Sequence, residues 1–280
     1  MKKESWDELQ HMLVEIRSWE KDQKDQWFWE KLGRLPFLLL DKLTPRIIQK
    51  KISDILNEIG SYVQSGGRYL ISERQTVKRI EKQWLSSGDP EAARYRSLSL
   101  DEVAVHVPVG VMRQVAADLS EHRTQLATVQ GASTGIGGLF TLAADIPAIL
   151  GLCLKIIQEI ALSYGYDPSR QEERIFAVKC LQFASSDIVG KKAILDELTR
   201  YGEADMEVAV ISQLQGWREV MAAYRDNFGW KKLFQMIPIA GMVFGAFINR
   251  GMLKDTAEAA HMLYRRRRVM ERLGGLSEEA

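Results

Sequence analysis

Apolar residues recur along this chain at helical spacing, and they predict a protein built almost entirely of α-helices. In the first predicted helix, Leu9, Leu13 and Ile16 share one face. A clearer amphipathic pattern follows in residues 48–59, where isoleucine returns at positions i, i+4, i+7 and i+11. Residues 103–107 form a short run that alternates like a strand. We therefore expect an all-α fold, a multi-helix bundle.

Capping signals divide this pattern into separate helices. Ser99 and Glu102 have the spacing of a capping box, which opens a helix. Gly165 suits the position just after a helix, where glycine is favoured. Asp145 and Pro147 together indicate the start of another helix. At this start we expect Asp145 to be an N-cap or a paired carboxylate in the core.

The chain shows no internal repeat and no low-complexity segment. The best candidate linker is the sequence Ser-Gly-Asp-Pro at residues 87–90. We expect one domain over residues 1–280, in which N-terminal helices (1–87) lead into a glycine-rich core (96–273). The core contains two glycine-rich, apolar helical segments, which we expect to be packed together.

The first of these segments, Gly-Ala-Ser-Thr-Gly-Ile-Gly-Gly, matches three known sequence motifs. Gly131, Gly135 and Gly137 fit the G-x-x-x-G-x-G phosphate loop of short-chain dehydrogenases. Gly131, Ser133 and Gly135 fit the G-x-S-x-G elbow of a serine hydrolase. Gly131 and Gly135, with Gly138 close by, also fit the small-x-x-x-small pattern that lets helices approach closely.

The helical surroundings favour the packing interpretation. A dehydrogenase loop and a serine elbow both need a strand before the glycines, whereas residues 121–130 continue a helix. No tyrosine of the chain has a lysine four residues later, so the usual dehydrogenase pair is missing. A serine hydrolase that uses Ser133 stays open as an alternative function, with His261 following it in the chain.

The second glycine-rich segment lies within residues 233–249, which carry no charge. Gly241 and Gly245 repeat the small-x-x-x-small spacing there, and Asn249 ends the run. We expect these residues to pack against the first segment, with Asp145 set into an otherwise apolar surface. A second alternative is a soluble module that binds an acyl chain or a partner helix between the two segments.

Neither apolar block predicts a simple transmembrane span. The first block is interrupted by Asp145, Lys155 and Glu159, and a charge at mid-bilayer costs at least about 2.5 kcal/mol. The second block is shorter than the roughly 20 apolar residues that a span needs, and it contains Pro238. We therefore expect a buried helical hairpin, or a segment that dips into the membrane interface.

A basic tract near the C-terminus is the second candidate for contact with a membrane. Successive helix positions turn by about 100°, so four neighbouring arginines cannot all face one patch. They either end a solvated helix or contact an anionic surface, together with lysines beside the second apolar block. The residues are Arg265, Arg266, Arg267, Arg268, Lys231 and Lys232.

Composition excludes several classes of protein. The 280 residues carry a net charge of +1, which argues against a strongly basic nucleic-acid binder. Cys153 and Cys180 provide neither a disulfide framework nor a metal cluster. The first residues are too charged for a signal peptide, so we expect a cytoplasmic protein.

Two Glu-x-x-His pairs have the spacing that di-iron helical bundles use. His11 of the first pair points away from the apolar face of its helix, and so does Glu258 of the second pair. Because di-iron ligands must project inward, we expect no metal site here. We also expect no cofactor and no catalytic residue.

A set of short motifs occurs in a particular order along the chain. They are Ser18-Trp19-Glu20, Gly135-Ile-Gly-Gly138, Ala144-Asp145-Ile146-Pro147, Tyr164-Gly165-Tyr166-Asp167, Ile237-Pro238-Ile239-Ala240-Gly241 and Asn249. This order resembles the EcsC family of bacterial proteins. The resemblance implies a helical protein found near membranes or ABC-transporter genes, with no established reaction. We therefore expect a non-enzymatic accessory protein on the inner face of the cell membrane, whose partner is that membrane surface or a membrane complex.

Overall fold

The computed structural model describes residues 4–25, 71–95, 97–134, 139–185, 191–192, 194–195 and 238–278. It does not describe the side chains of residues 126–150 and 238–250. The elements are α1 (Trp6–Asp25), α5 (Glu73–Ser86), the short 3-10 helix η3 (Ala92–Arg94), α6 (Leu100–His106), α7 (Val109–Thr134), α8 (Leu139–Ser163), α9 (Gln171–Ser185) and α12 (Pro238–Glu278). No strand occurs in these residues, so the predicted all-α fold is confirmed. Residues 103–106 of the alternating run lie in α6, and Val107 follows its end.

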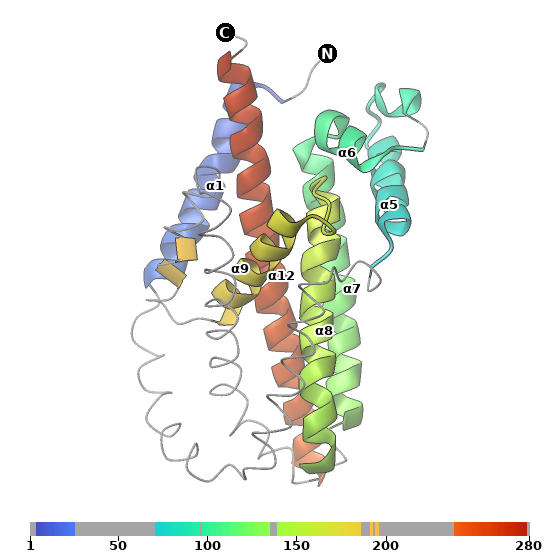
Figure 1. The fold of residues 1–280 in the computed structure, drawn as a ribbon, viewed down its shortest axis with the longest axis vertical. Coiled ribbons are helices and arrows are strands. Elements are labelled where there is room, and N and C mark those ends of the chain that lie inside the picture. Colours follow the sequence, from blue (N-terminus) through green and yellow to red (C-terminus); the bar gives the residue numbers. More distant parts are fainter. Residues whose placement is uncertain are drawn as a thin grey trace.

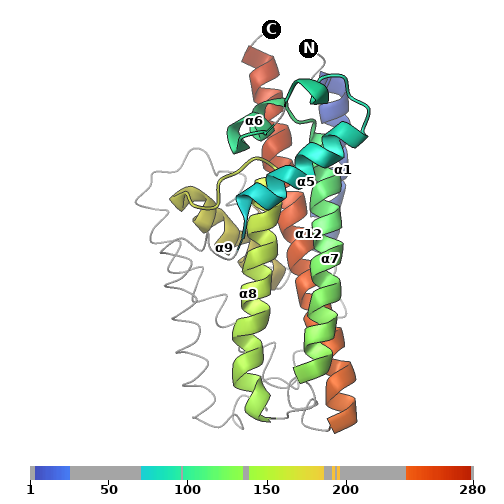
Figure 2. The ribbon, with the colours of Figure 1, turned by 90° about the vertical axis from the view of Figure 1, so that its right-hand side faces the viewer.

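Three long helices form the body of the bundle. α7 and α8 run side by side in opposite directions, and α12 lies against both of them (Figure 1). α1 packs along the C-terminal half of α12, and α9 packs on α8 and α12. α5 crosses the upper parts of α7 and α8 from outside (Figure 2). Helices from both ends of the sequence are therefore neighbours.

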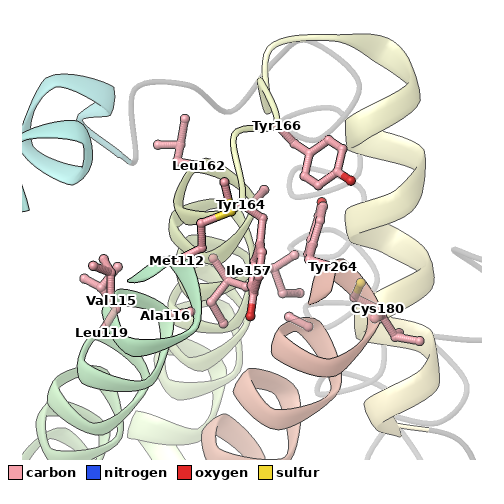
Figure 3. Close-up of a cluster of buried hydrophobic side chains, with 14 of the residues drawn as sticks. Met112, Val115, Ala116, Leu119, Ile157, Leu162, Tyr164, Tyr166, Cys180 and Tyr264 are labelled. Carbon is pink, nitrogen blue, oxygen red and sulfur yellow. The ribbon is translucent and has the colours of Figure 1, made fainter. Parts of the chain in front are cut away.

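The core lies where α7, α8, α9 and α12 meet (Figure 3). From Cys153 to Ser163, every residue of α8 except Lys155 is buried. Met112 of α7 approaches this part of α8 from one side, and Tyr264 of α12 approaches from another. A helix that is buried on all its faces needs the continuous apolar sequence that α8 has.

The predicted apolar face of the first helix and the predicted Ser99–Glu102 capping box are confirmed, whereas the isoleucine face at 48–59 lies outside the described residues. Leu9, Leu13 and Ile16 are all buried, on the face of α1 that meets α12. The Ser99 side chain accepts a hydrogen bond from the Glu102 backbone N–H, and the Glu102 carboxylate accepts one from the Ser99 backbone N–H. This capping box opens α6 as expected.

Gly165 ends α8 in the way predicted, and it also allows a close contact. Its φ is 76°, and the N–H groups of Gly165 and Tyr166 donate to the carbonyls of Leu162 and Ala161. This pair of backbone hydrogen bonds is the Schellman motif. A Cβ on Gly165 would lie 2.7 Å from the Cα of Ala104, so α6 can approach the turn only because glycine is there.

The predicted start of α8 is wrong. The helix begins at Leu139, so Asp145 is not its N-cap and lies inside the second turn. Pro147 lies further inside, where it lacks the N–H that would bond to the carbonyl four residues earlier. The chain stays helical through this proline because tertiary packing outweighs a local preference.

α12 is longer than the sequence indicates. The described part of the second apolar block, residues 238–249, continues without a break into the residues that follow it, and together they form one helix of 41 residues. Gly251 lies just after the block and adds about 1 kcal/mol of local helix cost. Leu253, Ala257 and Ala260 beyond it are buried against the bundle, which offsets that cost.

Candidate functional site

The predicted glycine segments come together at one end of the bundle. Gly131 lies in the last turn of α7, and Gly241, Gly245 and Asn249 lie in the first turns of α12. Both of these helix ends and the start of α8, with Asp145, lie at the lower end in Figures 1 and 2. Other predicted site residues lie outside the described residues, namely Gly135, Gly137, Gly138, Lys231 and Lys232.

Among the described residues, this end of the bundle is almost free of charge. Residues 124–134 of α7 and 238–249 of α12 contain no charged residue, and residues 139–150 of α8 contain Asp145 alone. We call these three segments the charge-poor end. Among the residues that the structure describes, no helix is both long enough and apolar enough to cross a membrane.

Ser133 does not have the geometry of a catalytic elbow. It is the second-last residue of the 26-residue helix α7, and helix rather than strand precedes it. A nucleophile elbow places its serine on a strained turn between a strand and a helix. The serine-hydrolase alternative therefore lacks the backbone that it needs.

The acyl-chain alternative gains no support from the hollow found on the described residues. This hollow lies on α5, away from α12, between Lys78, Glu81, Lys82, Leu85 and Ser86. It is open to solvent, whereas a site for a fatty chain encloses most of its ligand.

The four-arginine tract lies at the opposite end of α12, and its guanidinium groups are engaged inside the molecule. The side chains point in different directions, as the helical turn requires. Each meets a different group: Arg265 bonds to Glu15 at 2.6 Å, Arg266 to Glu20 at 3.0 Å, Arg267 to Glu173 at 2.6 Å and Arg268 to the carbonyl of Tyr164 at 2.7 Å.

These contacts change the interpretation of the tract. Glu15 and Glu20 belong to α1, and Glu173 belongs to α9. Arg265 is only 6% exposed and Arg268 only 9%. The tract therefore joins α1, α8 and α9 to α12, and this placement gives no support to its expected contact with an anionic surface.

Tyr166 lies between two of these arginines. The guanidinium carbons of Arg267 and Arg268 are each 4.3 Å from the centre of its ring. Its hydroxyl donates to Glu271 at 3.0 Å, and burial raises the pKa of that hydroxyl far above its ordinary value. A neutral ring between two cations is a stabilising cation–π arrangement, with the ring held in place by Glu271.

Arg272 extends the arginine cluster by one turn, and sequence reasoning missed it. It forms an ion pair with Glu4 at 2.6 Å and donates to the carbonyl of Val107 at 2.8 Å and that of Ala104 at 3.1 Å. The second oxygen of Glu4 accepts from the backbone N–H of Val109. Its partners lie more than 160 positions away in sequence, so no local signal identifies them.

Two carboxylates of the cluster differ in pKa because their surroundings differ. The hydrogen bond from Arg265 lowers the pKa of Glu15, which is largely solvent-exposed. Burial raises the pKa of Glu173, and the nearby Arg267 only partly opposes this effect. Desolvation disfavours a charged carboxylate, so a deeply placed ion pair such as Glu173–Arg267 adds less stability than its short distance suggests.

A second group of polar atoms lies buried beside the cluster. The Tyr164 hydroxyl, the His261 Nδ1 atom and the Arg265 Nε atom are buried, and each lacks a hydrogen-bond partner among the described residues. The rings of Tyr164 and His261 meet edge to face, 5.9 Å apart. Burial, together with the charges of Arg265 and Arg113, lowers the pKa of His261 to about 4. His261 is therefore neutral at neutral pH.

The Glu-x-x-His residues have roles in packing. Glu258 is exposed and accepts a hydrogen bond at 2.8 Å from the indole of Trp19, which links α12 to α1. His11 is exposed beside Glu15 at 3.6 Å. Among the described residues, no three His, Cys, Asp or Glu side chains lie close enough together to hold a metal ion.

Known protein sequences resemble this chain over most of its length. The sequence profile of the EcsC protein family matches residues 10–269. The chain is 54% identical to the uncharacterized protein YdbA of Bacillus subtilis (strain 168) over 273 residues, which cover 98% of this chain and 97% of YdbA. It is 29% identical to Protein EcsC of the same organism over 150 residues, which cover 54% of this chain and 61% of that protein. No solved structure matches. The chain belongs to the EcsC family.

Proposed function

We propose that this chain is a non-enzymatic intracellular accessory protein that associates peripherally with a membrane or with a membrane protein complex. The observation that carries this proposal is the charge-poor end. Three helices bring uncharged or nearly uncharged segments to the same end of the bundle, while the arginine cluster occupies the other end.

The size of these segments suits contact with one side of a bilayer. Each has 11 or 12 residues, which span about 17–18 Å at 1.5 Å per residue. The hydrocarbon core of a bilayer is about 30 Å thick. The segments are therefore long enough to enter the interfacial region and too short to cross the core. Asp145 is their single charged group.

The arginine cluster supports a structural, non-catalytic role for the upper half of the molecule. Its cations are held by Glu15, Glu20 and Glu173 of other helices. Such an arrangement fixes the relative positions of α1, α9 and α12. It leaves the charge-poor end as the part of the described chain that is distinctive in composition. The family resemblance extends the proposal to a membrane complex such as an ABC transporter.

Flotation with lipid vesicles tests this proposal. We expect the full chain to float with vesicles that contain phosphatidylglycerol at low salt, and to appear partly in the salt-washable membrane fraction of cells. Leu142→Glu and Phe244→Glu each place a charge in the charge-poor end and should reduce binding at least tenfold. Met270→Glu is the matched control, because Met270 is exposed near the opposite end of α12.

Far-UV circular dichroism and thermal unfolding show whether each variant is folded. A wild-type chain that stays wholly in the cytosolic fraction and does not float with any vesicle would overturn the proposal. Equal loss of binding in Met270→Glu would also contradict it, because the effect would then not depend on the charge-poor end.

A further inference from the structure

α5 carries a row of cations on its outer face. Arg74, Lys78 and Lys82 are four residues apart, so they form one stripe along the helix. Leu85 continues the same line, and its side chain is 56% exposed. Arg79 is exposed beside the stripe. The helix contains four cations and two carboxylates, Glu73 and Glu81.

These cations differ from the arginines of α12 in having no internal partners. The side chains of these four residues form no ion pair and no hydrogen bond within the described part of the chain, whereas those of all the tract arginines do. Glu81 lines the same hollow as Lys78 and Lys82, and its carboxylate accepts a hydrogen bond at 2.6 Å from the backbone N–H of Leu98. With four cations and two carboxylates, α5 keeps a net positive charge at the surface.

The helix that presents the stripe is firmly attached to the bundle. Val77, Ile80 and Trp84 are buried on its opposite face. The indole of Trp84 donates to Asp89 at 2.7 Å, and Ser72 caps the first turn of α5. A docked helix presents its outer side chains in a fixed row, so a ligand that binds them has no helix to order.

The hollow on α5 lies directly within this stripe. Lys78, Lys82 and Leu85 line it together with Glu81 and Ser86, and its volume is about 510 Å³. It is open to solvent, so it suits a headgroup-sized anion that approaches from outside. The adjoining leucine supplies an apolar side chain beside the two ammonium groups.

The position of α5 connects the stripe to the charge-poor end. In Figure 2, α5 crosses the side of the bundle that faces the viewer, and the lower halves of α7 and α8 continue below it on the same side. α5 and the charge-poor segments of α7 and α8 therefore lie on the same side of the bundle.

We propose that Arg74, Lys78 and Lys82, with Leu85, form the site at which this protein binds the anionic headgroups of a phospholipid bilayer. This inference rests on the proposed function and adds to it the site, the charge of the lipid and the side of the bundle that meets the surface. The phosphate groups pair with the row of cations, and Leu85 enters the interfacial layer.

A bilayer fits these observations better than an acidic protein does. An acidic helix supplies carboxylates for the stripe, but it supplies no apolar layer for Leu85 and for the charge-poor segments of α7 and α8. A bilayer with anionic lipids supplies negative charges and an apolar layer at the same surface. The stripe also explains how a chain with a net charge of only +1 can prefer an anionic surface, because its unpaired cations are local.

The test compares two triple variants of the full chain by vesicle flotation. Arg74→Gln, Lys78→Gln and Lys82→Gln together remove the stripe. The matched control is Arg17→Gln, Lys21→Gln and Lys192→Gln, which removes three exposed cations from other helices or segments. We expect the stripe variant to bind vesicles of phosphatidylglycerol and phosphatidylcholine on the order of a hundredfold more weakly at low salt, and the control to bind like wild type.

The outcomes separate this inference from the proposed function. If wild type binds and the stripe variant binds equally well, the stripe inference is wrong and the proposed function stands. If wild type binds no vesicle at all, the proposed function fails and the stripe inference fails with it. Binding to polyglutamate as strong as that to vesicles would assign the stripe to acidic polypeptides and overturn the lipid assignment. Leu85→Ser should weaken vesicle binding without changing its dependence on salt.

Discussion

Arg268 and Arg272 lie one helical turn apart on α12, and each donates hydrogen bonds to the carbonyls that end a different helix. Arg268 contacts the carbonyl of Tyr164, just after α8, and Arg272 contacts those of Ala104 and Val107, at the end of α6. The last carbonyls of a helix have no partner within the helix, and a cation is favoured there. One face of α12 thus fixes the ends of two other helices.

Removing the first of these caps should destabilise the fold. Arg268→Gln loses both bonds to the Tyr164 carbonyl and the ion pair with Glu271. Because the carbonyl is buried and Arg268 is its donor, we expect a loss of about 2–4 kcal/mol in the free energy of unfolding. Urea denaturation followed by circular dichroism measures it.

An exposed ion pair provides the control for this variant. Arg170 lies 3.7 Å from Glu172, and its side chain is 70% exposed. Arg170→Gln should change stability by less than about 1 kcal/mol. Equal effects of Arg268→Gln and Arg170→Gln on the free energy of unfolding would contradict the prediction. The contacts of Arg268 at the end of α8 would then stabilise the fold no more than a surface ion pair does.

Gly165 is the position where a single methyl group should matter most. Gly165→Ala places a side chain at a φ of 76° and puts its Cβ 2.7 Å from the backbone of Ala104. The backbone conformation alone costs about 1–2 kcal/mol, and the displacement of α6 adds to it. Gly151→Ala is the matched control, because a Cβ there meets nothing within 4 Å and should stabilise α8 by up to about 1 kcal/mol. Thermal unfolding should shift in opposite directions for the two variants.

The pair formed by Arg123 and Glu159 links α7 to α8 below the arginine cluster. The Arg123 Nε donates to Glu159 at 2.8 Å, and the glutamate side chain is 6% exposed. Glu159→Leu leaves a largely buried guanidinium without its partner, and we expect it to cost about 3 kcal/mol. The double variant Arg123→Leu/Glu159→Leu should be more stable than Glu159→Leu alone. A double-mutant cycle in urea checks this, and strictly additive losses would contradict it.

Acid should weaken the fold through His261. Its pKa is about 4 in the folded chain and 6.5 ordinarily, so the unfolded chain takes up the proton first as pH falls. The stability that His261 contributes is complete above about pH 6.5 and is lost progressively down to about pH 4, up to about 3 kcal/mol. His261→Gln should remove this part of the pH dependence in urea titrations.

Carboxylates also titrate in this pH range. The contribution of His261 is therefore the difference between wild type and His261→Gln in the free energy of unfolding at each pH. His122→Gln removes an exposed histidine of α7 and should keep the pH dependence of wild type. A His261→Gln variant that loses stability between pH 7 and pH 4 as steeply as wild type would show that His261 is not a source of the acid sensitivity.

Local signals in the sequence identify much of this fold. The spacing of Leu9, Leu13 and Ile16, the Ser99–Glu102 capping box and Gly165 each act within one or two helical turns, and all three predictions are confirmed. Such signals depend on neighbouring residues alone. They are therefore readable without knowledge of the tertiary structure.

Features that depend on tertiary contacts are not readable in this way. Pro147 and Gly251 have low helix propensity, yet α8 and α12 continue through them because packing along the bundle outweighs that preference. The tract Arg265–Arg268 has the composition of a surface patch. Its actual partners, such as Glu15 and Glu173, come from distant segments that only the folded chain brings near.

The contact between α1 and α12 has a consequence for the time at which the protein can fold. Glu4 pairs with Arg272, and the buried face of α1 rests on the last helix of the chain. At a synthesis rate of about 5–20 residues per second, the ribosome makes α1 roughly ten to fifty seconds before it completes α12. During that interval Leu9, Leu13 and Ile16 lack the helix that covers them. The apolar face of α1 can therefore be covered only after the ribosome has made α12.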